Sequence, residues 1–285
     1  MNELEFVAGL RGLPLHPAAR GLKDDCAVME MGGQTLILTH DMMAEGTHFE
    51  PEANMADVAW KLVAMNLSDL ASKGAEPVGA MVGVSLGRDD AGFLSGLRDA
   101  LVVYDMPLLG GDTIASTGPS TYGITALGRA THQPVPSRKG AKVGDALYLT
   151  GMVGSAMLGF EGHSQHLDAF NRPQPRLVEG RALAPVVSAM MDISDGLLLD
   201  AWRMARASEV TFRFNPELIP VADSARMDEC LRWGDDYELL FSIDPASEVP
   251  VPATRIGTVE PMGEAPLFLG GTAMSDPKSL GYSHG

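Results

Sequence analysis

Residues 56–74 read ADVAWKLVAMNLSDLASKG, and the fold prediction begins from the spacing of apolar residues in this stretch. Val58, Leu62 and Met65 recur at spacings of four and three residues, and Asp69 continues the series four residues later. This spacing is typical of an amphipathic helix, and it places one carboxylate on the apolar face. Because a buried ionised carboxylate is costly unless it is paired or bound to a metal, Asp69 indicates an ion pair or a cation site.

Both alternatives for Asp69 have candidates in the sequence. Lys61 and Lys73 are the nearby bases, and only Lys73, four residues away, can reach back along the helix. For a cation site, further acids stand where apolar runs meet turns, namely Asp24 and Asp25 in GLKDDCAVME, Asp41 in LILTHD, Asp112 in LLGGDT, and Asp192 and Asp195 in MMDISDGLLLD. Each alone is a common turn or N-cap residue, but together they favour hard divalent cations such as Mg²⁺, bound through oxygen.

The composition is that of an ordinary globular chain with a large negative charge. The 285 residues predict two modest domains or one large one, and 45% of the residues are hydrophobic. With 21 basic against 37 acidic residues, the net charge is −16. This balance argues against a nucleic-acid-binding protein and against binding to an anionic membrane surface. If the protein handles phosphates, something other than Lys and Arg must neutralise them, and metal ions can do so.

No membrane or targeting segment is expected. The longest uncharged run, Ala146–Phe160, is short and interrupted by glycines, and the N-terminal residues MNELEFVAGLRG lack a basic region before an apolar core. The two cysteines, Cys26 and Cys230, together with the absence of a CxxC pair, predict free thiols and no disulfide scaffold. We therefore expect a cytoplasmic protein.

Short apolar runs alternate with longer helical patterns, which indicates a mixed α/β or α+β fold. The expected strands are Thr35–Thr39, Val78–Leu86, Tyr122–Arg129, Ala146–Thr150, Val210–Phe214 and Tyr237–Ile243. The expected helices are Ala56–Ser72, Ala91–Tyr104, Arg176–Met190, Gly196–Ser208 and Asp223–Leu231. The basic, proline-rich stretch Thr131–Gly144 is the expected linker between an N-terminal half, residues 1–137, and a C-terminal half, residues 138–285. Glu161–Pro175 is expected to be a loop.

Two glycine-containing turns combine backbone flexibility with acids. The GxxxxGK[ST] and GxGxxG patterns are absent, so the sequence has neither a P-loop nor a Rossmann fingerprint. Gly110–Thr113 (GGDT) allows backbone amides to approach a phosphate beside a carboxylate. Asp192–Gly196 (DISDG) places two acids at a helix start, where free N–H groups favour anions. Metal ions that bridge the acids to a phosphate reconcile these two features.

At these residues the sequence resembles the thiamine-monophosphate kinase family, within the aminoimidazole ribonucleotide synthetase-like superfamily. The motifs occur in the family's order: Gly21-Leu-Lys-Asp24-Asp25-Cys26-Ala27, Thr39-His40-Asp41, Glu45-Gly-Thr-His48-Phe49, Asn66-Leu-Ser-Asp69-Leu-Ala-Ser-Lys-Gly74-Ala75, Leu109-Gly-Gly-Asp112-Thr113, Arg172-Pro173-Gln-Pro175-Arg176, Asp192-Ile-Ser194-Asp195-Gly196 and Gly234-Asp235-Asp236-Tyr237-Glu238-Leu239. The match runs from about residue 20 to the C-terminus. The ordered set is far more specific than any single motif.

The resemblance implies a two-domain architecture, with an N-terminal mixed sheet and helices that form a homodimer, and a C-terminal α+β half that closes the active-site cleft. It implies ATP-dependent phosphorylation of thiamine monophosphate to thiamine diphosphate, with several Mg²⁺ ions between the halves. The implied metal ligands are Asp24, Thr39, His40 (through its backbone), Asp41, Asp69, Asp112, Asp192 and Asp195, among which Asp41, Asp69 and Asp195 form the catalytic set. The implied ATP contacts are Tyr104, Gly111, Asp112, Arg138 and Ser194, and the implied substrate contacts are His48 and Asp235.

The sequence departs from the family's pattern at a few places. Lys23 stands where many relatives have glycine, and Asp235 fills a place often held by Glu. Relatives commonly have an aromatic residue shortly before a Gly-Tyr pair near the end, whereas Leu280 precedes Gly281-Tyr282 here. The alternatives are another enzyme of the superfamily and a non-catalytic protein that binds metal and nucleotide. The absence of a terminal cysteine and of an early Cys–Lys pair disfavours two of the other enzymes, the hydrogenase-maturation and selenophosphate-forming ones.

Overall fold

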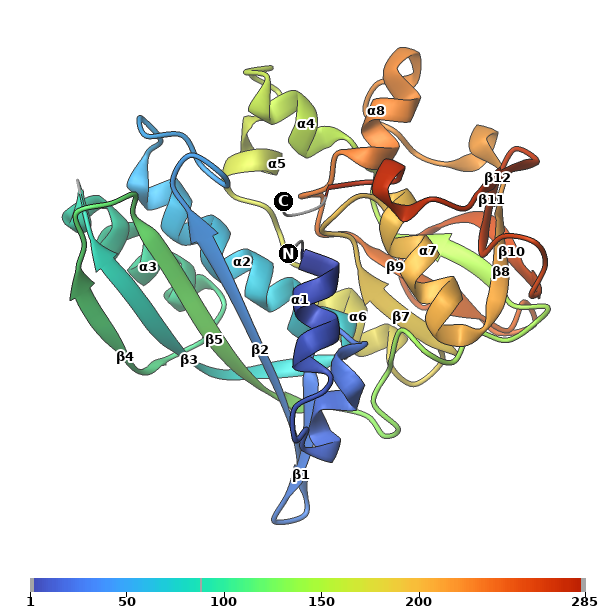
Figure 1. Cartoon of the computed structure of the whole chain (residues 1–285), viewed down its shortest axis with the longest axis horizontal. Coiled ribbons are helices and arrows are strands. Elements are labelled where there is room, and N and C mark those ends of the chain that lie inside the picture. Colours follow the sequence, from blue (N-terminus) through green and yellow to red (C-terminus); the bar gives the residue numbers. More distant parts are fainter. Residues whose placement is uncertain (1–2, 88, 283–285) are drawn as a thin grey trace.

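The computed structural model describes residues 3–87 and 89–282 and contains two β-sheets, which occupy the left and right of Figure 1. The first sheet has the strand order β1-β2-β5-β3-β4 and the second β12-β11-β8-β10-β6-β9-β7. Strands of the first sheet are β1 (Ala27–Met31), β2 (Gln34–Ala44), β3 (Ala75–Leu86), β4 (Leu108–Ala115) and β5 (Thr121–Ala130). Strands of the second are β6 (Ala146–Leu149), β7 (Ala189–Asp192), β8 (Val210–Phe214), β9 (Leu239–Ile243), β10 (Thr254–Pro261), β11 (Leu267–Leu269) and β12 (Thr272–Met274).

Helices cover these sheets and connect them. The α-helices are α1 (Glu3–Leu10), α2 (Met55–Ser72), α3 (Asp90–Val103), α4 (Ser155–Phe160), α5 (Leu167–Asn171), α6 (Leu177–Leu183), α7 (Leu197–Ser208) and α8 (Met227–Arg232). Short 3₁₀ turns occur at Pro17–Leu22, Pro216–Leu218, Ser224–Arg226 and Pro277–Ser279. The α+β architecture predicted from the sequence is confirmed. Along the chain, the strands of the first sheet precede residues 131–145 and those of the second follow them, and these residues form neither helix nor strand.

The central element is α2, the helix predicted from the spacing of its apolar residues. Its N-cap residue Asn54 accepts a hydrogen bond from the backbone N–H of Ala56 at 3.0 Å. Along the helix Val58, Leu62 and their neighbours are buried in a core that also contains Phe241 of the second sheet. The helix contacts β2, β5 and α3 in the first half and α6 and β7 in the second. One apolar core therefore fixes the two halves against a single helix.

Several predicted elements are confirmed and others are wrong. Helices α2, α3 and α7 and strands β5, β6 and β8 lie within a residue or two of their predicted bounds, whereas β2 and β3 extend further than expected. The predicted helix Arg176–Met190 is wrong in its second part, because α6 ends at Leu183 and Ala189–Asp192 forms the fully buried strand β7. Pro185, which cannot donate to a helix ladder, follows the helix end. The expected loop Glu161–Pro175 contains α5, and β9 begins at Leu239.

Two smaller expectations can also be compared with the structure. Cys26 and Cys230 are both free and buried, as predicted. Within residues 3–87 and 89–282, no helix has the length and apolar content needed to cross a bilayer.

A buried ion pair ties the end of α2 to the segment before β1. Lys73, the C-cap residue of α2, is fully buried, and its Nζ lies 2.6 Å from Oδ1 of Asp24 and also contacts Asp25. This arrangement answers the question posed by Asp69, because the one lysine within reach of that carboxylate binds two other acids instead. The ammonium also keeps two buried carboxylates from facing each other uncompensated.

We predict that Lys73→Met lowers the free energy of unfolding by about 3–5 kcal/mol, because it removes the fully buried cation that two buried carboxylates share and leaves each with one arginine. Urea unfolding followed by circular dichroism measures the change. The control is Arg129→Ala, which breaks an ion pair with Glu76 whose side chains are 50% and 49% exposed and which should cost less than about 1 kcal/mol. Equal losses in the two variants would contradict the prediction.

Candidate functional site

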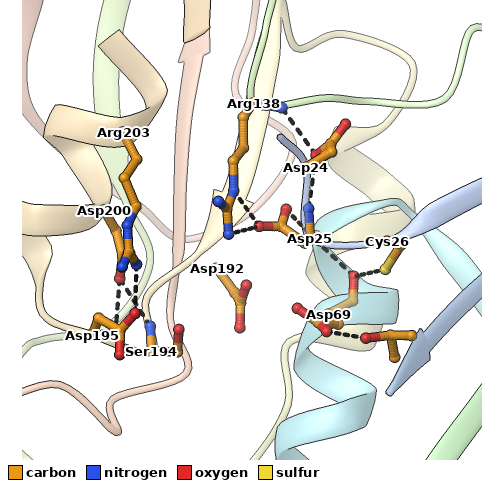
Figure 2. A network of polar contacts seen from close by, with 12 residues as sticks. Asp24, Asp25, Cys26, Asp69, Arg138, Asp192, Ser194, Asp195, Asp200 and Arg203 are labelled. Carbon is orange, nitrogen blue, oxygen red and sulfur yellow. Dashed lines mark hydrogen bonds and ion pairs between the residues drawn. The ribbon is translucent and has the colours of Figure 1, made fainter. Parts of the chain in front are cut away.

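Three carboxylates from distant parts of the chain meet between the two sheets. Asp25 precedes β1, Asp69 lies in the last turn of α2, and Asp192 ends β7. One oxygen of each lies within 4.8 Å of an oxygen of the other two. Figure 2 shows Asp69 and Asp192 facing the space next to Asp25. We call these three residues the carboxylate cluster, and it realises the predicted convergence of aspartates on one place.

The hydrogen bonds described for the Asp69 and Asp192 carboxylates come from hydroxyl groups, and the charge of Arg138 only partly offsets the effects that raise the pKa of Asp192. The Thr39 hydroxyl donates to Asp69, and the Ser68 hydroxyl donates to Asp192 at 2.7 Å. Burial, reinforced by neighbouring carboxylates, raises the pKa of Asp69 well above its usual range. Burial, together with the charge of Asp25, raises the pKa of Asp192 to about 8. Both groups therefore carry an electrostatic penalty that a bound cation would remove.

Asp41 contributes a further acid to the same region. It lies on β2, where its backbone N–H donates to Oδ1 of Asn66 on α2 at 3.0 Å. Burial and the charges of Asp195 and Asp25 raise the pKa of the Asp41 carboxyl to about 6. Hard divalent cations prefer several oxygen ligands, and these carboxylates supply them close together. The residues present therefore fit Mg²⁺.

The second acid of the Asp24-Asp25 pair, and not the first, belongs to the carboxylate cluster. Oδ2 of Asp24 accepts from Arg20 at 2.6 Å and from Ser137 at 2.7 Å, in addition to the contact with Lys73. Burial alone would raise the pKa of Asp24, but Lys73 and these hydrogen bonds outweigh it and hold that pKa below the usual value. The carboxylate of Asp24 thus already has three side-chain donors, and its predicted role as a metal ligand stays a prediction.

Asp25 is also partly neutralised. Nε of Arg138 donates to Oδ1 of Asp25 at 2.5 Å, as Figure 2 shows, and Lys73 contacts the other oxygen. The pKa of Arg138 is raised, because the charges of Asp25 and neighbouring carboxylates outweigh the cost of burial. Three bases, Lys73, Arg138 and Arg20, therefore face five closely placed acids, and a negative surplus remains. The five acids are Asp24, Asp25, Asp41, Asp69 and Asp192.

The DISDG turn forms a second acidic group beside the cluster. Arg203 lies 2.5 Å from Oδ2 of Asp195 and 2.9 Å from Oδ1 of Asp200. Oδ2 of Asp200 accepts from the backbone N–H groups of Ser194 and Asp195, both at 3.0 Å. Burial raises the pKa of Asp200 to about 6. Asp200 therefore holds the backbone of the DISDG turn through two hydrogen bonds. It is the last residue of the stretch MMDISDGLLLD, where an acid close to the turn could have indicated this role.

Other predicted residues lie away from the cluster. Gly111 and Asp112 are exposed on the edge strand β4, where Asp112 is paired with Gly83. His40 is exposed on β2, and its Nδ1 lies 2.9 Å from the Thr125 hydroxyl. Neither the Asp112 nor the His40 side chain has a described contact with Asp25, Asp69 or Asp192 within residues 3–87 and 89–282.

The predicted substrate contacts, His48 and Asp235, both have described partners. Nδ1 of His48 accepts from the backbone N–H of Ala44 at 3.1 Å. Oδ2 of Asp235 lies 2.6 Å from Nζ of Lys61, and Oδ1 accepts from the Tyr237 hydroxyl at 2.9 Å. The backbone N–H of Asp235 donates to Ser194 at 2.8 Å, which places Asp235 beside the DISDG turn. Lys61 and Asp235 are far apart in the chain, so no local sequence pattern indicates this ion pair.

Comparison with known proteins matches each half of the chain to a domain of one family. Residues 23–130 match the N-terminal domain of AIR synthase related protein, and residues 142–264 match its C-terminal domain. A thiamine-monophosphate kinase of Escherichia coli K12 is 35% identical, with 78% of this chain and 76% of the relative covered. That of Caulobacter vibrioides is 34% identical over 94% of this chain and 86% of the relative. The structure of AaThiL complexed with AMPPCP and TMP superposes with a TM-score of 0.87 at 25% identity, covering 99% and 97% of the two chains.

We predict that, without divalent cations, the free energy of unfolding falls as pH rises from about 5 to 8. Folded Asp192 holds its proton to about pH 8, whereas the unfolded chain releases it near the ordinary value of 3.8, so folding favours low pH across this window. Each such group contributes roughly 1.4 kcal/mol per pH unit. Urea unfolding in EDTA at several pH values measures the slope, and Mg²⁺ should restore stability most strongly at pH 8. Asp192→Asn should flatten the slope, and stability that rises with pH in EDTA would contradict the assignment.

Proposed function

The chain belongs to the thiamine-monophosphate kinase family, and we propose that it transfers the terminal phosphoryl group of ATP to thiamine monophosphate with Mg²⁺ held by the buried aspartates. Its E. coli relative carries the name of this kinase, and the AaThiL structure contains AMPPCP and TMP. The observation that carries the proposal for this chain is the approach of Asp25, Asp69 and Asp192 oxygens to within 4.8 Å of one another. Such a cluster suits a reaction between two polyanions in a protein whose net charge is −16.

The proposed metal ligands are the carboxylates that keep a negative surplus. Asp25, Asp69 and Asp192 form the centre, and Asp41 with the Thr39 hydroxyl extends it along β2. When bound, Mg²⁺ would neutralise the charge of the reacting phosphates and favour an in-line displacement. The predicted roles of Asp112, Asp195 and the His40 backbone in metal binding stay predictions.

The chain's own groups orient and balance the charges around this centre. Lys73 and Arg138 hold Asp25, and Asn66 fixes the β2 backbone at Asp41. The attacking oxygen belongs to a phosphate monoester, whose second pKa lies near 6, so it is largely ionised at neutral pH and no strong general base is required. Rate acceleration then comes from positioning and from charge stabilisation.

The nucleotide and the substrate are assigned to different sets of residues around the carboxylate cluster. The proposed ATP contacts are Tyr104, Gly111, Asp112, Arg138 and Ser194. Arg138 is supported by its place against Asp25, and Ser194 by its place in the DISDG turn. Asp235 and His48 are proposed to face the thiamine phosphate, with Lys61 held against Asp235 by an ion pair.

Phosphorus NMR of the protein with ATP, Mg²⁺ and thiamine monophosphate tests the function directly. A new diphosphate signal that grows with ADP is expected. Tight ATP binding without that signal would overturn the kinase assignment and favour a non-catalytic metal- and nucleotide-binding protein.

We predict that Asp69→Asn lowers kcat at limiting Mg²⁺ by more than about 100-fold, because it removes a buried ligand at the centre of the carboxylate cluster. Raising the Mg²⁺ concentration should recover part of the loss. The matched control is Glu76→Gln, since Glu76 is exposed in a surface ion pair, and it should leave kcat within about twofold. Full activity of Asp69→Asn at limiting Mg²⁺ would refute the metal assignment.

We further propose that the chain forms a homodimer through the exposed face of the first sheet. Met42 on β2 and Met81 on β3 are 53% and 52% exposed, although both neighbour buried residues of the same strands. Strand register places them on one face, since Met42 pairs with Gly123, Gly123 with Gly83, and Met81 stands two residues before Gly83. An apolar sheet face of this kind is typical of an interface.

The double variant Met42→Glu/Met81→Glu should sediment as a monomer in analytical ultracentrifugation, because two charges would be buried in the proposed interface. Leu218→Glu is the control, since Leu218 is 48% exposed in the second half of the chain and should leave the dimer intact. A wild-type monomer, or a double variant that stays dimeric, would contradict the proposal.

A further inference from the structure

An aromatic cluster lies beside Asp235 and has no role in the function described so far. It consists of Phe160 at the end of α4, Phe170 in α5 and Trp233 after α8. The Phe160 ring contacts Phe170 at a centroid distance of 5.4 Å and Trp233 at 5.1 Å. In Figure 1, α4 and α5 lie above α2 and next to α8. Residues from three separate elements thus build one surface.

The aromatic cluster is joined to the proposed substrate site by direct contacts. Nζ of Lys61 lies 3.8 Å from the centroid of the Phe170 ring and 2.6 Å from Oδ2 of Asp235. An unbroken series of contacts therefore runs from Asp235 through Lys61 to the three aromatic rings. Asp235 and the aromatic cluster therefore belong to one contiguous set of side chains.

Trp233 is anchored close to the DISDG turn by its neighbour in sequence. Gly234 has a φ of +95°, and a Cβ there would stand 2.4 Å from the carbonyl oxygen of Ser194. No other residue type fits so near that turn in this conformation. With Asp235 N–H donating to the same carbonyl at 2.8 Å, Trp233 is fixed at the edge of the acidic site.

Two of the rings remain open to solvent. Phe160 is 46% exposed and Trp233 is 37% exposed, so both offer apolar aromatic surface to the solvent. Exposed aromatic residues grouped beside a polar site are typical of a surface that stacks on a flat ligand. A cationic ring gains further from the negative face of an indole.

We propose that Trp233, supported by Phe160, stacks on the rings of the phosphate acceptor and selects a substrate with a flat, cationic heteroaromatic group. This inference rests on the proposed function, whose acceptor carries a thiazolium and an aminopyrimidine ring. It also supplies the ring partner that this sequence lacks at Leu280, which is buried. Trp233 is then a specificity residue, and the phosphoryl transfer itself takes place at the aspartates.

Steady-state kinetics of Trp233→Ala test the proposal. The KM for thiamine monophosphate should rise about 10-fold, with kcat and the KM for ATP within about twofold, because the lost interaction binds the acceptor before and during transfer. Trp233→Phe should recover most of the affinity. Unchanged KM in Trp233→Ala, while the wild type makes product, would overturn this inference and leave the kinase assignment standing.

A fluorescence experiment gives a readout that does not depend on activity. The chain has three tryptophans, so Trp60→Phe/Trp202→Phe leaves Trp233 as the reporter. Thiamine monophosphate should quench its emission, whereas ATP and inorganic phosphate should not. Quenching without any product in the NMR assay would refute the kinase assignment and support the ring site, and the absence of quenching would overturn the ring site.

Tyr282→Ala is the matched control for the kinetics. Tyr282 is 43% exposed and its backbone N–H donates to Asp195 at 3.0 Å, so it is an aromatic residue at the same edge of the site. It should leave the KM for thiamine monophosphate within about twofold. A large rise in KM in Tyr282→Ala without one in Trp233→Ala would show that Tyr282, and not Trp233, stacks on the acceptor, and would contradict the proposal.

Discussion

The structure depends on holding several carboxylates together inside a protein that supplies too few bases to neutralise them. Lys73, Arg138 and Arg20 compensate Asp24 and part of the charge of Asp25. Asp69 and Asp192 accept hydrogen bonds from the Thr39 and Ser68 hydroxyls, and burial raises the pKa of both and of Asp41. A fold that tolerates this arrangement without cations does so by keeping protons on the acids, at the expense of stability at neutral pH.

Helix α2 makes the arrangement possible because it belongs to both halves of the molecule. Its apolar residues share one core with the first sheet and with Phe241 of the second. Its polar residues reach outward in several directions, with Asn66 to β2, Ser68 to Asp192, and Lys73 to the acids before β1. A shift of either half relative to α2 would therefore separate the ligands, so packing and chemistry are coupled through one helix.

The sequence predicted the parts of this site that follow from local periodicity. Asp69 continued an apolar stripe, and Asp192 stood between an apolar run and a glycine, so both were recognisable. The difference between Asp24 and Asp25 was not, because it depends on the tertiary fold: Lys73 contacts both acids, and Asp24 also accepts from Arg20 and Ser137. Strand β4 was overlooked because its sequence contains two glycines and lacks an apolar period of two, and almost all of its residues are exposed. Strand β7 was taken as helix because all four of its residues are buried.

The most direct test of the central claim is the number of protons released when Mg²⁺ binds, measured by titration calorimetry at pH 7 in buffers of different ionisation enthalpy. With the pKa of Asp192 near 8 before the cation binds, we expect binding to release close to one proton or more, and Asp192→Asn to release fewer. Mg²⁺ binding without proton release, or no binding at millimolar Mg²⁺, would contradict the account.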